Sequence, residues 1–315
     1  MIICKGNIKS FDIPKNLILA IGNFEGIHLG HQKVINSCIE IAQDNGFIPA
    51  ILTFDPHPNS VVDSKNNKKP IYSHTQKLEI LKTFSISHLF ILDFDINLMK
   101  LNPDDFIHDI LVERFKVKAV VTGQNFYFGY KKLGNATILS NVAKKYSFSY
   151  YAIEKYTENG IEVSSSKIRE LLSLGMLETS NNLLGRRYAI EGKIIYGEKL
   201  AETLGFKTAN ILLNEKCSYP MKGVYLVRIT LSDEKRKLYG VANIGVRPTT
   251  SNESKLLLEV HIFNFNKDIY GKNAKVEFLH LIRPERNFKN IECLKTQIQK
   301  DVKDAQYVNS FPLLR

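Results

Sequence analysis

The first half of the chain alternates short apolar runs with segments whose apolar residues recur every three or four positions. Four of the apolar runs predict buried strands: residues 17–22, 47–54, 88–94 and 118–123. The helix expected between the first two strands ends at Asn45-Gly46 and carries apolar residues on one face: Val34, Ile35, Cys38, Ile39 and Ala42. A further helix begins at Asn102-Pro103 and carries Phe106, Ile110 and Phe115. Strands that alternate with helices predict a parallel sheet, with ligands at the carboxyl ends of its strands.

After about residue 183 the pattern changes to successive strand-like runs separated by Gly, Asn and Asp turns. These runs are YAIEGKIIYG, GVYLVRITL, LYGVANIG, LLLEVHIFNF and AKVEFLHLI. Such a series without helices between the strands predicts a closed antiparallel β-barrel. A terminal helix follows, with apolar residues at helical spacing that we expect to pack on the barrel: Ile291, Leu294, Ile298, Val302 and Ala305. The sequence thus predicts two domains, residues 1–180 and 183–315.

Composition narrows the class of protein. With 315 residues, 44% hydrophobic and 24% charged, the chain is long enough for two ordinary globular cores. Its four cysteines form no CxxC pair, which speaks against a zinc site or a disulfide framework and favours a reducing cytoplasm. No apolar run is long enough to span a bilayer. The formal charge of +11 suits nucleic acid, acidic lipid or phosphorylated small molecules, and scattered lysines favour a solvated surface.

The segment GNFEGIHLGHQ, residues 22–32, carries the clearest chemistry. It follows a predicted strand and runs into a helix, so Gly22, Gly26 and Gly30 allow the backbone to approach a ligand, and the helix N-terminus offers N–H groups to phosphate. His28 and His31 would face the same phosphate and stabilise charge during in-line displacement. The alternatives are chance surface histidines and a metal-binding pair, for which Glu25 is the only acidic or cysteine ligand nearby at typical spacing.

Two other segments are candidates for ligand binding. Ser164, Ser165 and Ser166 precede a helical pattern, where they can cap the helix or aim hydroxyl groups at an anion, and Arg169 adds a fixed charge one turn later. A plain helix cap is the alternative. His57 lies between two prolines beyond a strand, which fits a ligand contact and a rigid turn equally well.

The first half resembles a known family. His28-Leu29-Gly30-His31 is similar to the HxGH signature of the nucleotidyltransferase superfamily, and GNFEGIHLGH resembles its form in bacterial bifunctional riboflavin kinase/FMN adenylyltransferases, with Glu25 where aspartate is usual. Three further segments resemble family motifs in the same order: TFDPHP (53–58), GQNFYFG (123–129) and SSSKIRELL (164–172).

This resemblance implies a Rossmann-like nucleotidyltransferase domain with a parallel sheet. It implies catalysis by His28, His31 and Arg169. It implies ATP binding by Gly22, Asn23, Phe24, Gly30, Ser164, Ser165 and Ser166. It also implies flavin contacts from His57 and Asn125.

The second half carries an independent resemblance. GKIIYGEKLAETLGFKTAN (192–210) is similar to the riboflavin kinase pattern, and the segments KGVYLVRI, VANIGVRPT and LLLEVHIFNFNKDIYG follow it in the family's order. The resemblance implies that Thr208 and Asn210 hold Mg²⁺ and phosphate, which suits hard oxygen ligands. It implies that Glu259 is the catalytic base for the riboflavin hydroxyl. It adds ATP contacts from Gly197 and Gly205 and a flavin contact from Arg247.

Departures from the family patterns leave alternatives open. Ala201, Glu202 and Lys207 stand where Gly, Arg and Pro are usual, so the kinase half could be active or could have become a flavin-binding module. In the first half, Tyr127 replaces a frequent arginine. A basic RNA-binding barrel protein is the alternative of another class. The favoured interpretation is a cytoplasmic enzyme, a monomer or weak homo-oligomer, that uses ATP, riboflavin and FMN as substrates with Mg²⁺ and binds neither nucleic acid nor membrane.

Overall fold

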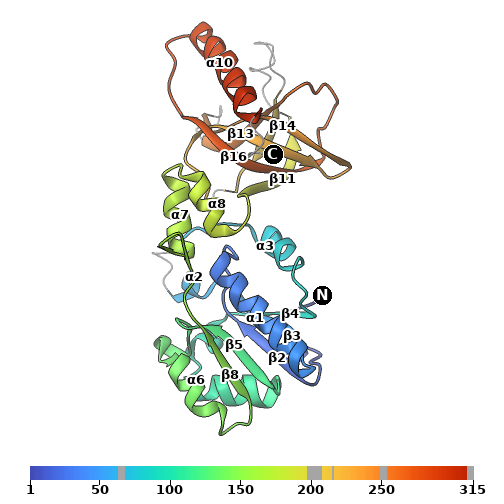
Figure 1. Ribbon diagram of the computed structural model, residues 1–315, viewed down its shortest axis with the longest axis vertical. Coiled ribbons are helices and arrows are strands. Elements are labelled where there is room, and N and C mark those ends of the chain that lie inside the picture. Colours follow the sequence, from blue (N-terminus) through green and yellow to red (C-terminus); the bar gives the residue numbers. More distant parts are fainter. Residues whose placement is uncertain (63–67, 197–207, 215, 249–253, 311–315) are drawn as a thin grey trace. The chain divides into compact units, whose positions relative to one another are not determined.

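The protein divides into two compact units. A computed structural model describes residues 1–62, 68–196, 208–214, 216–248 and 254–310 of the chain. Residues 1–69 and 73–165 form unit 1, and residues 70–72 and 166–315 form unit 2 (Figure 1). Among the described residues, no helix is both long and apolar enough to cross a membrane.

Unit 1 is built on a six-stranded parallel sheet with the strand order β1-β4-β3-β2-β5-β8. Its strands are β1 (Ile2–Gly6), β2 (Leu17–Ile21), β3 (Ile48–Asp55), β4 (His88–Asp93), β5 (Ala119–Gly123) and β8 (Ser149–Ile153). The four central strands confirm the four predicted from apolar runs. The two edge strands, β1 and β8, were not predicted, because each pairs with one neighbour only and stays largely exposed, so neither needs a continuous apolar run.

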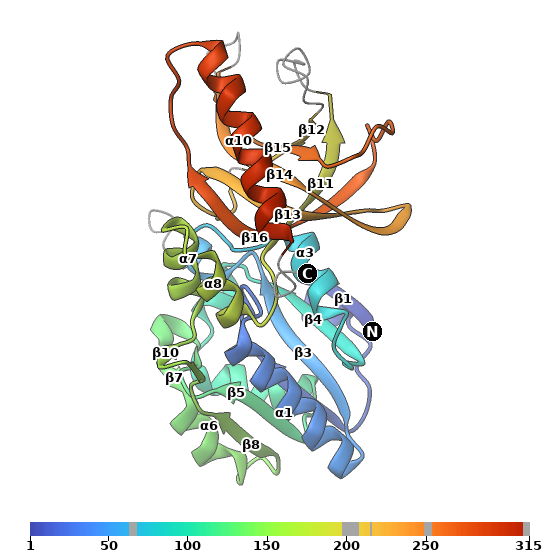
Figure 2. The ribbon, with the colours of Figure 1, turned by 45° about the horizontal axis from the view of Figure 1, so that its top comes forward.

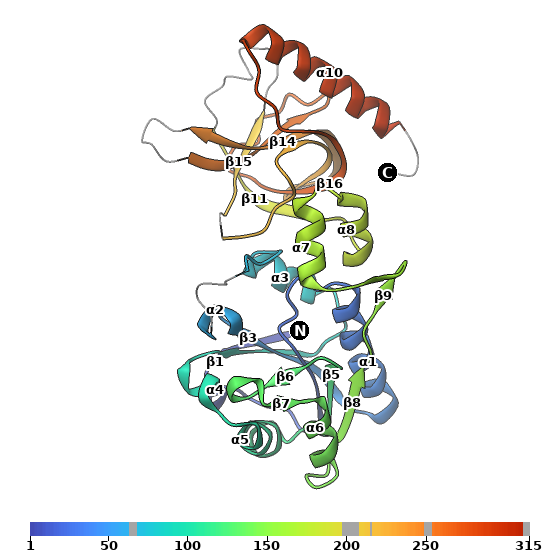
Figure 3. The same cartoon turned by 90° about the vertical axis from the view of Figure 1, so that its left-hand side faces the viewer.

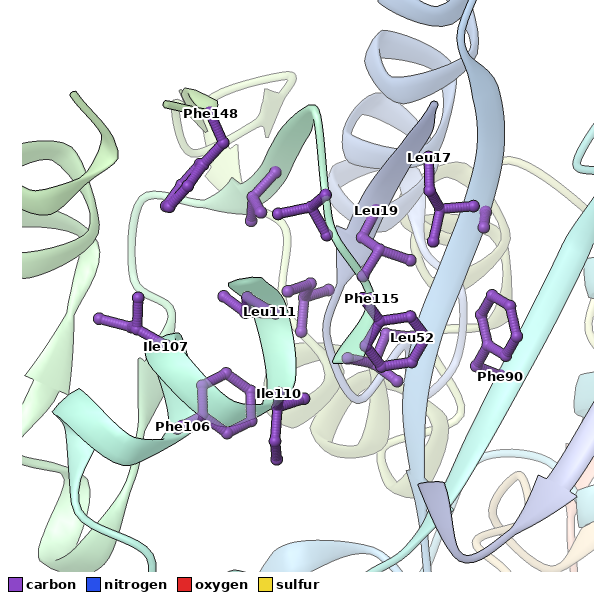
Figure 4. Close-up of a cluster of buried hydrophobic side chains, with 14 of the residues drawn as sticks. Leu17, Leu19, Leu52, Phe90, Phe106, Ile107, Ile110, Leu111, Phe115 and Phe148 are labelled. Atoms are coloured by element: carbon purple, nitrogen blue, oxygen red, sulfur yellow. The ribbon is translucent and has the colours of Figure 1, made fainter. Parts of the chain in front are cut away.

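The central strands are apolar over most of their length because both faces of the sheet are covered. Along β2, Leu17 and Leu19 point to one face, while Ile18 and Ala20 point to the other. The first face packs against aromatic and aliphatic residues that include Phe106, as Figure 4 shows. The opposite face packs against α1 and α3. Because successive side chains alternate between the two faces of the sheet, one strand contributes residues to two separate cores.

Helices connect the strands of unit 1. They are α1 (Leu29–Asn45), α2 (Pro58–Val62), α3 (His74–Leu81), α4 (Ile96–Lys100), α5 (Pro103–Asp105), the π-helix η3 (Phe106–Arg114) and α6 (Ala136–Ala143). Helix α1 ends as predicted, with Gly46 in the left-handed conformation (φ 65°). Asn102 caps the second predicted helix by accepting from the Asp105 N–H at 2.8 Å. Most of that helix winds as a π-helix, which the apolar spacing did not indicate.

Unit 2 contains the predicted closed barrel, with the strand order β11-β12-β15-β14-β13-β16 (Figure 2). Its strands are β11 (Ala189–Ile195), β12 (Ala209–Leu212), β13 (Gly223–Leu231), β14 (Glu234–Pro248), β15 (Ser254–Ile262) and β16 (Asn273–Pro284). Five correspond to the predicted runs. The sixth, β12, has four residues and was not predicted as a strand. All adjacent pairs within the barrel are antiparallel.

Two short helices, α7 (Ser165–Ser173) and α8 (Leu177–Leu184), precede the barrel in the chain, and α10 (Ile291–Asn309) follows it. The predicted border between residues 180 and 183 lies inside α8. The prediction of a terminal helix packed on the barrel is confirmed for Val302 and Ala305. It is wrong for Ile291, which is 52% exposed at the first turn. The packed face instead includes a buried polar residue, Asp301.

Candidate functional site

In the parallel sheet of unit 1, the order in which successive strands are added reverses between β2 and β5. From β2 the chain builds outward through β3 and β4 on one side, while β5 and β8 lie on the other. Loops that leave two such strands at their carboxyl ends diverge and open a crevice for a ligand. The predicted segments 22–32, 53–58 and 123–129 lie at the carboxyl ends of β2, β3 and β5, so the fold brings all three to this edge of the sheet.

The loop between β2 and α1 has an unusual backbone. Phe24 and Ile27 take positive φ angles of 45° and 43°, and Gly26 takes 81°. Positive φ is costly for residues with side chains, so the surrounding structure has to hold this loop. The buried ring of Phe24 is one anchor, and a Cβ at Gly22 would lie 3.3 Å from it. Gly22 therefore serves close packing of the ring, and its N–H donates to the Leu52 oxygen at 3.2 Å.

The two histidines lie at the start of α1. His28 is the N-cap, and its Nδ1 accepts from the His31 N–H at 3.3 Å, which leaves the proton of a neutral His28 ring on Nε2. The His28 and His31 rings stack with their centroids 3.7 Å apart. A Cβ at position 30 would lie 3.3 Å from the His28 ring, so Gly30 leaves room for this ring. The structure thus brings the predicted pair together at a helix N-terminus, where anions bind favourably.

The serine segment reaches the same loop. The Ser165 hydroxyl donates to the Glu25 main-chain oxygen at 2.7 Å, a contact within unit 1. Ser164 and Ser165 are half-buried, and Ser166 is exposed. Helix α7 begins at Ser165, and Arg169 follows one turn later as a half-buried residue of unit 2. Ser165 therefore ties the start of α7 to the glycine-rich loop.

The two flavin candidates of unit 1 occupy turns. His57 is half-buried, and its carbonyl oxygen accepts from the Ser60 N–H at 2.8 Å and from the Ser60 hydroxyl at 2.7 Å. Asn125 is exposed in the turn after β5, next to a hydrogen bond from the Phe126 N–H to the Gly123 oxygen. The β6-β7 ribbon (Tyr127–Phe128 and Gly134–Asn135) follows and is visible in Figure 3. Tyr127 on this ribbon is 57% exposed.

A half-buried lysine beside the loop was not predicted. Lys77 of α3 donates through Nζ to the Asn23 main-chain oxygen at 2.6 Å and to the Thr53 hydroxyl at 3.1 Å. Burial lowers the pKa of Lys77 to about 8, although the carboxylates of Glu25 and Asp55 raise it in part. A lysine in the polar-looking run HTQKLEIL has the sequence signature of a solvated residue, so no pattern in the sequence distinguished it.

In unit 2, three polar residues form a row across neighbouring strands. Glu259 of β15 pairs with Asn210 of β12 on one side and with Asn243 of β14 on the other. Directly paired residues of antiparallel strands point to the same face. Their apolar neighbours, such as Leu258, point into the barrel and are fully buried, so the row lies on the outer face. Sequence reasoning identified Asn210 and Glu259 through the resemblance and missed Asn243.

Asn210 has an orphaned polar atom. Its side chain is 3% exposed, and its Oδ1 is buried with no hydrogen-bond partner among the described residues. Its Nδ2 reaches the Thr208 carbonyl oxygen only at 3.5 Å. A buried carbonyl oxygen without a partner is costly unless a ligand satisfies it. The donor type fits Mg²⁺, which prefers oxygen ligands.

Other predicted residues of the kinase half are not placed. Gly197 and Gly205 lie outside the described residues, as do Ala201, Glu202 and Lys207. Arg247 lies in β14 and pairs with Lys255 along the backbone, but its side chain is outside the described part of the structure.

Comparisons with known proteins match both halves of the chain. A family model of FAD synthetase matches residues 10–167, and one of riboflavin kinase matches residues 184–309. The bifunctional riboflavin kinase/FMN adenylyltransferase of Haemophilus influenzae is 38% identical over 91% of this chain and 92% of its own. The enzyme of the same description from Escherichia coli K12 is 32% identical over 90% of each chain.

Among solved structures, a Streptococcus pneumoniae protein described as a macrolide-efflux protein is 25% identical. Its superposition covers 99% of this chain and 100% of the Streptococcus pneumoniae chain, with a TM-score of 0.87.

Proposed function

Because the chain belongs to the family of bifunctional riboflavin kinase/FMN adenylyltransferases, we propose that the loop 22–31 and the row Asn210–Glu259–Asn243 carry its two reactions. The chain phosphorylates riboflavin with ATP to give FMN, and it transfers an adenylyl group from a second ATP to FMN, with release of pyrophosphate. Flavin is substrate and product of these reactions.

The observation that carries the adenylyltransferase assignment is the stacked His28–His31 pair at the N-terminus of α1. In the reaction, an oxygen of the FMN phosphate attacks the α-phosphorus of ATP, and the bond to the pyrophosphate oxygen breaks. The His28 and His31 side chains donate hydrogen bonds to the oxygens on which negative charge increases, and α1 contributes its N–H groups. Arg169 supplies a further positive charge to the triphosphate.

The remaining contacts of this proposed site come from the backbone and from polar side chains. Gly22, Asn23, Phe24 and Gly30 bring the main chain of the loop close to ATP. The serines at the start of α7, Ser164, Ser165 and Ser166, bind phosphate oxygens, which is supported by the Ser165 contact with the loop. His57 and Asn125 contact the flavin from the ends of β3 and β5.

In the kinase half, Glu259 accepts the proton of the riboflavin 5′-hydroxyl as that oxygen attacks the γ-phosphorus of ATP. Thr208 and Asn210 would hold Mg²⁺, and the unpartnered Oδ1 of Asn210 supports this assignment. When bound, Mg²⁺ neutralises charge on the phosphates of ATP. Gly197 and Gly205 are proposed as ATP contacts and Arg247 as a flavin contact on the family resemblance alone.

We further propose that residues 1–180 act as the adenylyltransferase domain and residues 183–315 as the kinase domain. The protein works in the cytoplasm as a monomer or weak homo-oligomer, and it binds neither nucleic acid nor membrane. The scattered lysines and the absence of a CxxC pair in the sequence support this picture.

One assay tests the function. The protein is incubated with riboflavin, ATP and Mg²⁺, and FMN and FAD are resolved by chromatography over time. We expect FMN to form first and FAD to follow. A second sample receives FMN in place of riboflavin. If FAD forms from this FMN but no FMN forms from riboflavin, the adenylyltransferase assignment stands and the kinase assignment is overturned.

A further inference from the structure

Lys77 lies in a closed hydrogen-bond triangle beneath the loop that follows β2. Its Nζ donates to the Asn23 oxygen at 2.6 Å and to the Thr53 hydroxyl at 3.1 Å, and that hydroxyl donates to the same Asn23 oxygen at 3.3 Å. All three residues belong to unit 1. The Asn23 carbonyl therefore receives two donors, one from α3 and one from β3.

This carbonyl lies at the point where the backbone becomes strained. Phe24, the next residue, has a φ of 45°, and Ile27 has a φ of 43°. A residue with a side chain keeps such angles only when its surroundings impose them. Lys77 holds the loop at Asn23, and the Ser165 hydroxyl holds it two residues later at Glu25. These contacts fix the loop on both sides of Phe24.

The charge of Lys77 is expensive to bury, and a neutral donor would cost less. The charged groups around it are Glu25 in the loop, Asp55 at the end of β3, His74 at the start of α3 and Lys5 of β1. Lys5 already pairs with Asp55 at 2.6 Å. Nearby carboxylates therefore compensate the charge of Lys77 only in part in the free protein. An anion bound to the loop would stabilise this charge further.

We propose that Lys77 is a positioning residue of the adenylyltransferase reaction. It holds the Asn23 carbonyl and so keeps the main chain of residues 22–28 in the shape that receives the triphosphate of ATP. Its positive charge stabilises that loop when the triphosphate is bound. The proposal rests on the assignment of this loop to ATP binding.

The test compares Lys77→Met and Lys77→Arg with the wild type in steady-state FAD formation from supplied FMN. The matched control is Lys82→Met, because Lys82 caps the same helix but is exposed and bonded to Glu79. We expect Lys77→Met to raise the KM for ATP roughly 10-fold or more and to lower kcat/KM by about 10², since a misplaced loop loses oriented contacts. Lys77→Arg should recover part of this loss. Lys82→Met and FMN formation by every variant should match the wild type.

A pH profile adds a readout that a purely structural role would not change. The kcat/KM for ATP reports groups of the free enzyme. With a Lys77 pKa of about 8, it should fall above that pH in the wild type. This limb should be missing in Lys77→Met and displaced to higher pH in Lys77→Arg. If Lys77→Met does not fold, the pH profiles of the wild type and of Lys77→Arg test the proposal. The limb above about pH 8 should then move to higher pH in Lys77→Arg, and an unmoved limb would contradict the role of Lys77.

The outcomes separate this proposal from the assignment on which it rests. One outcome is that Lys77→Met keeps the kinetics and the pH profile of the wild type while His31→Ala still loses FAD formation. This outcome would overturn the role of Lys77 and leave the assignment of the loop intact. Wild-type FAD formation in both variants would instead overturn the assignment of the loop. Equal loss of FMN and FAD formation in folded Lys77→Met would also count against a local positioning role.

Discussion

The imidazole rings of His28 and His31 stack with their centroids 3.7 Å apart and their planes inclined by 16°. His28 is the N-cap of α1 and His31 lies three residues later, so both rings lie on one side of the start of the helix. An anion binds favourably at this end of a helix, because its free N–H groups and its dipole favour negative charge.

Replacement of either histidine by alanine tests this pair. Because each ring contributes one donor to the increasing negative charge, His28→Ala and His31→Ala should each lower kcat for FAD formation from FMN by roughly 10² or more. FMN formation from riboflavin should stay close to the wild-type rate, which serves as the internal control for folding. Parallel loss of both activities would argue against separate sites.

The kinase base is tested by Glu259→Gln. The amide keeps the shape of the side chain but cannot accept the proton of the riboflavin hydroxyl, so FMN formation should fall by roughly 10² to 10⁴. FAD formation from supplied FMN should persist in the same sample. If the wild type is as inactive on riboflavin as the Glu259→Gln variant, the kinase half has lost its activity.

The terminal helix is expected to depend on one buried ion pair. Arg283 of β16 binds Asp301 of α10 through three hydrogen bonds of 2.8–3.1 Å, and the Asp301 side chain is 4% exposed. Asp301→Asn leaves the Arg283 charge without a buried partner and should lower the free energy of unfolding of unit 2 by about 3–5 kcal/mol. Urea denaturation followed by circular dichroism measures this change.

Asp233→Asn is the matched control for that variant, because Asp233 pairs with Lys272 at 2.6 Å on the exposed surface. Its stability should stay close to that of the wild type. A similar loss in both variants would contradict a special role for the buried pair.

The desolvated ammonium group of Lys77 also predicts how stability depends on pH. Its pKa is about 8 in the folded chain, against an ordinary value of 10.5, so the unfolded chain binds more protons between these values. The wild type should therefore gain stability relative to Lys77→Met as the pH rises from about 8 to about 10.5, by up to roughly 3 kcal/mol. Paired urea titrations at pH 7.5, 9 and 10.5 measure the difference. A difference that does not change with pH would show that Lys77 titrates near its ordinary value.

Local sequence patterns predicted the features that depend on residue type and spacing. Four apolar runs predicted the four central strands, because a strand covered on both faces is apolar at most of its positions. Gly46 and Asn102 marked helix ends, because left-handed caps and side-chain caps need particular residue types. The His28–His31 motif carried its chemistry in its spacing, since residues three apart at the start of a helix lie on one side of it.

The remaining features depend on contacts between residues far apart in the chain. The stretch HTQKLEIL does not show that Lys77 donates to the Asn23 oxygen and to the Thr53 hydroxyl, since these partners lie 54 and 24 positions away. Asp301 breaks the apolar spacing of α10 because Arg283, 18 residues earlier, satisfies it. Asn243 joined the row with Asn210 and Glu259 through the register of the barrel, which is set by strand pairing and closure rather than by any local pattern.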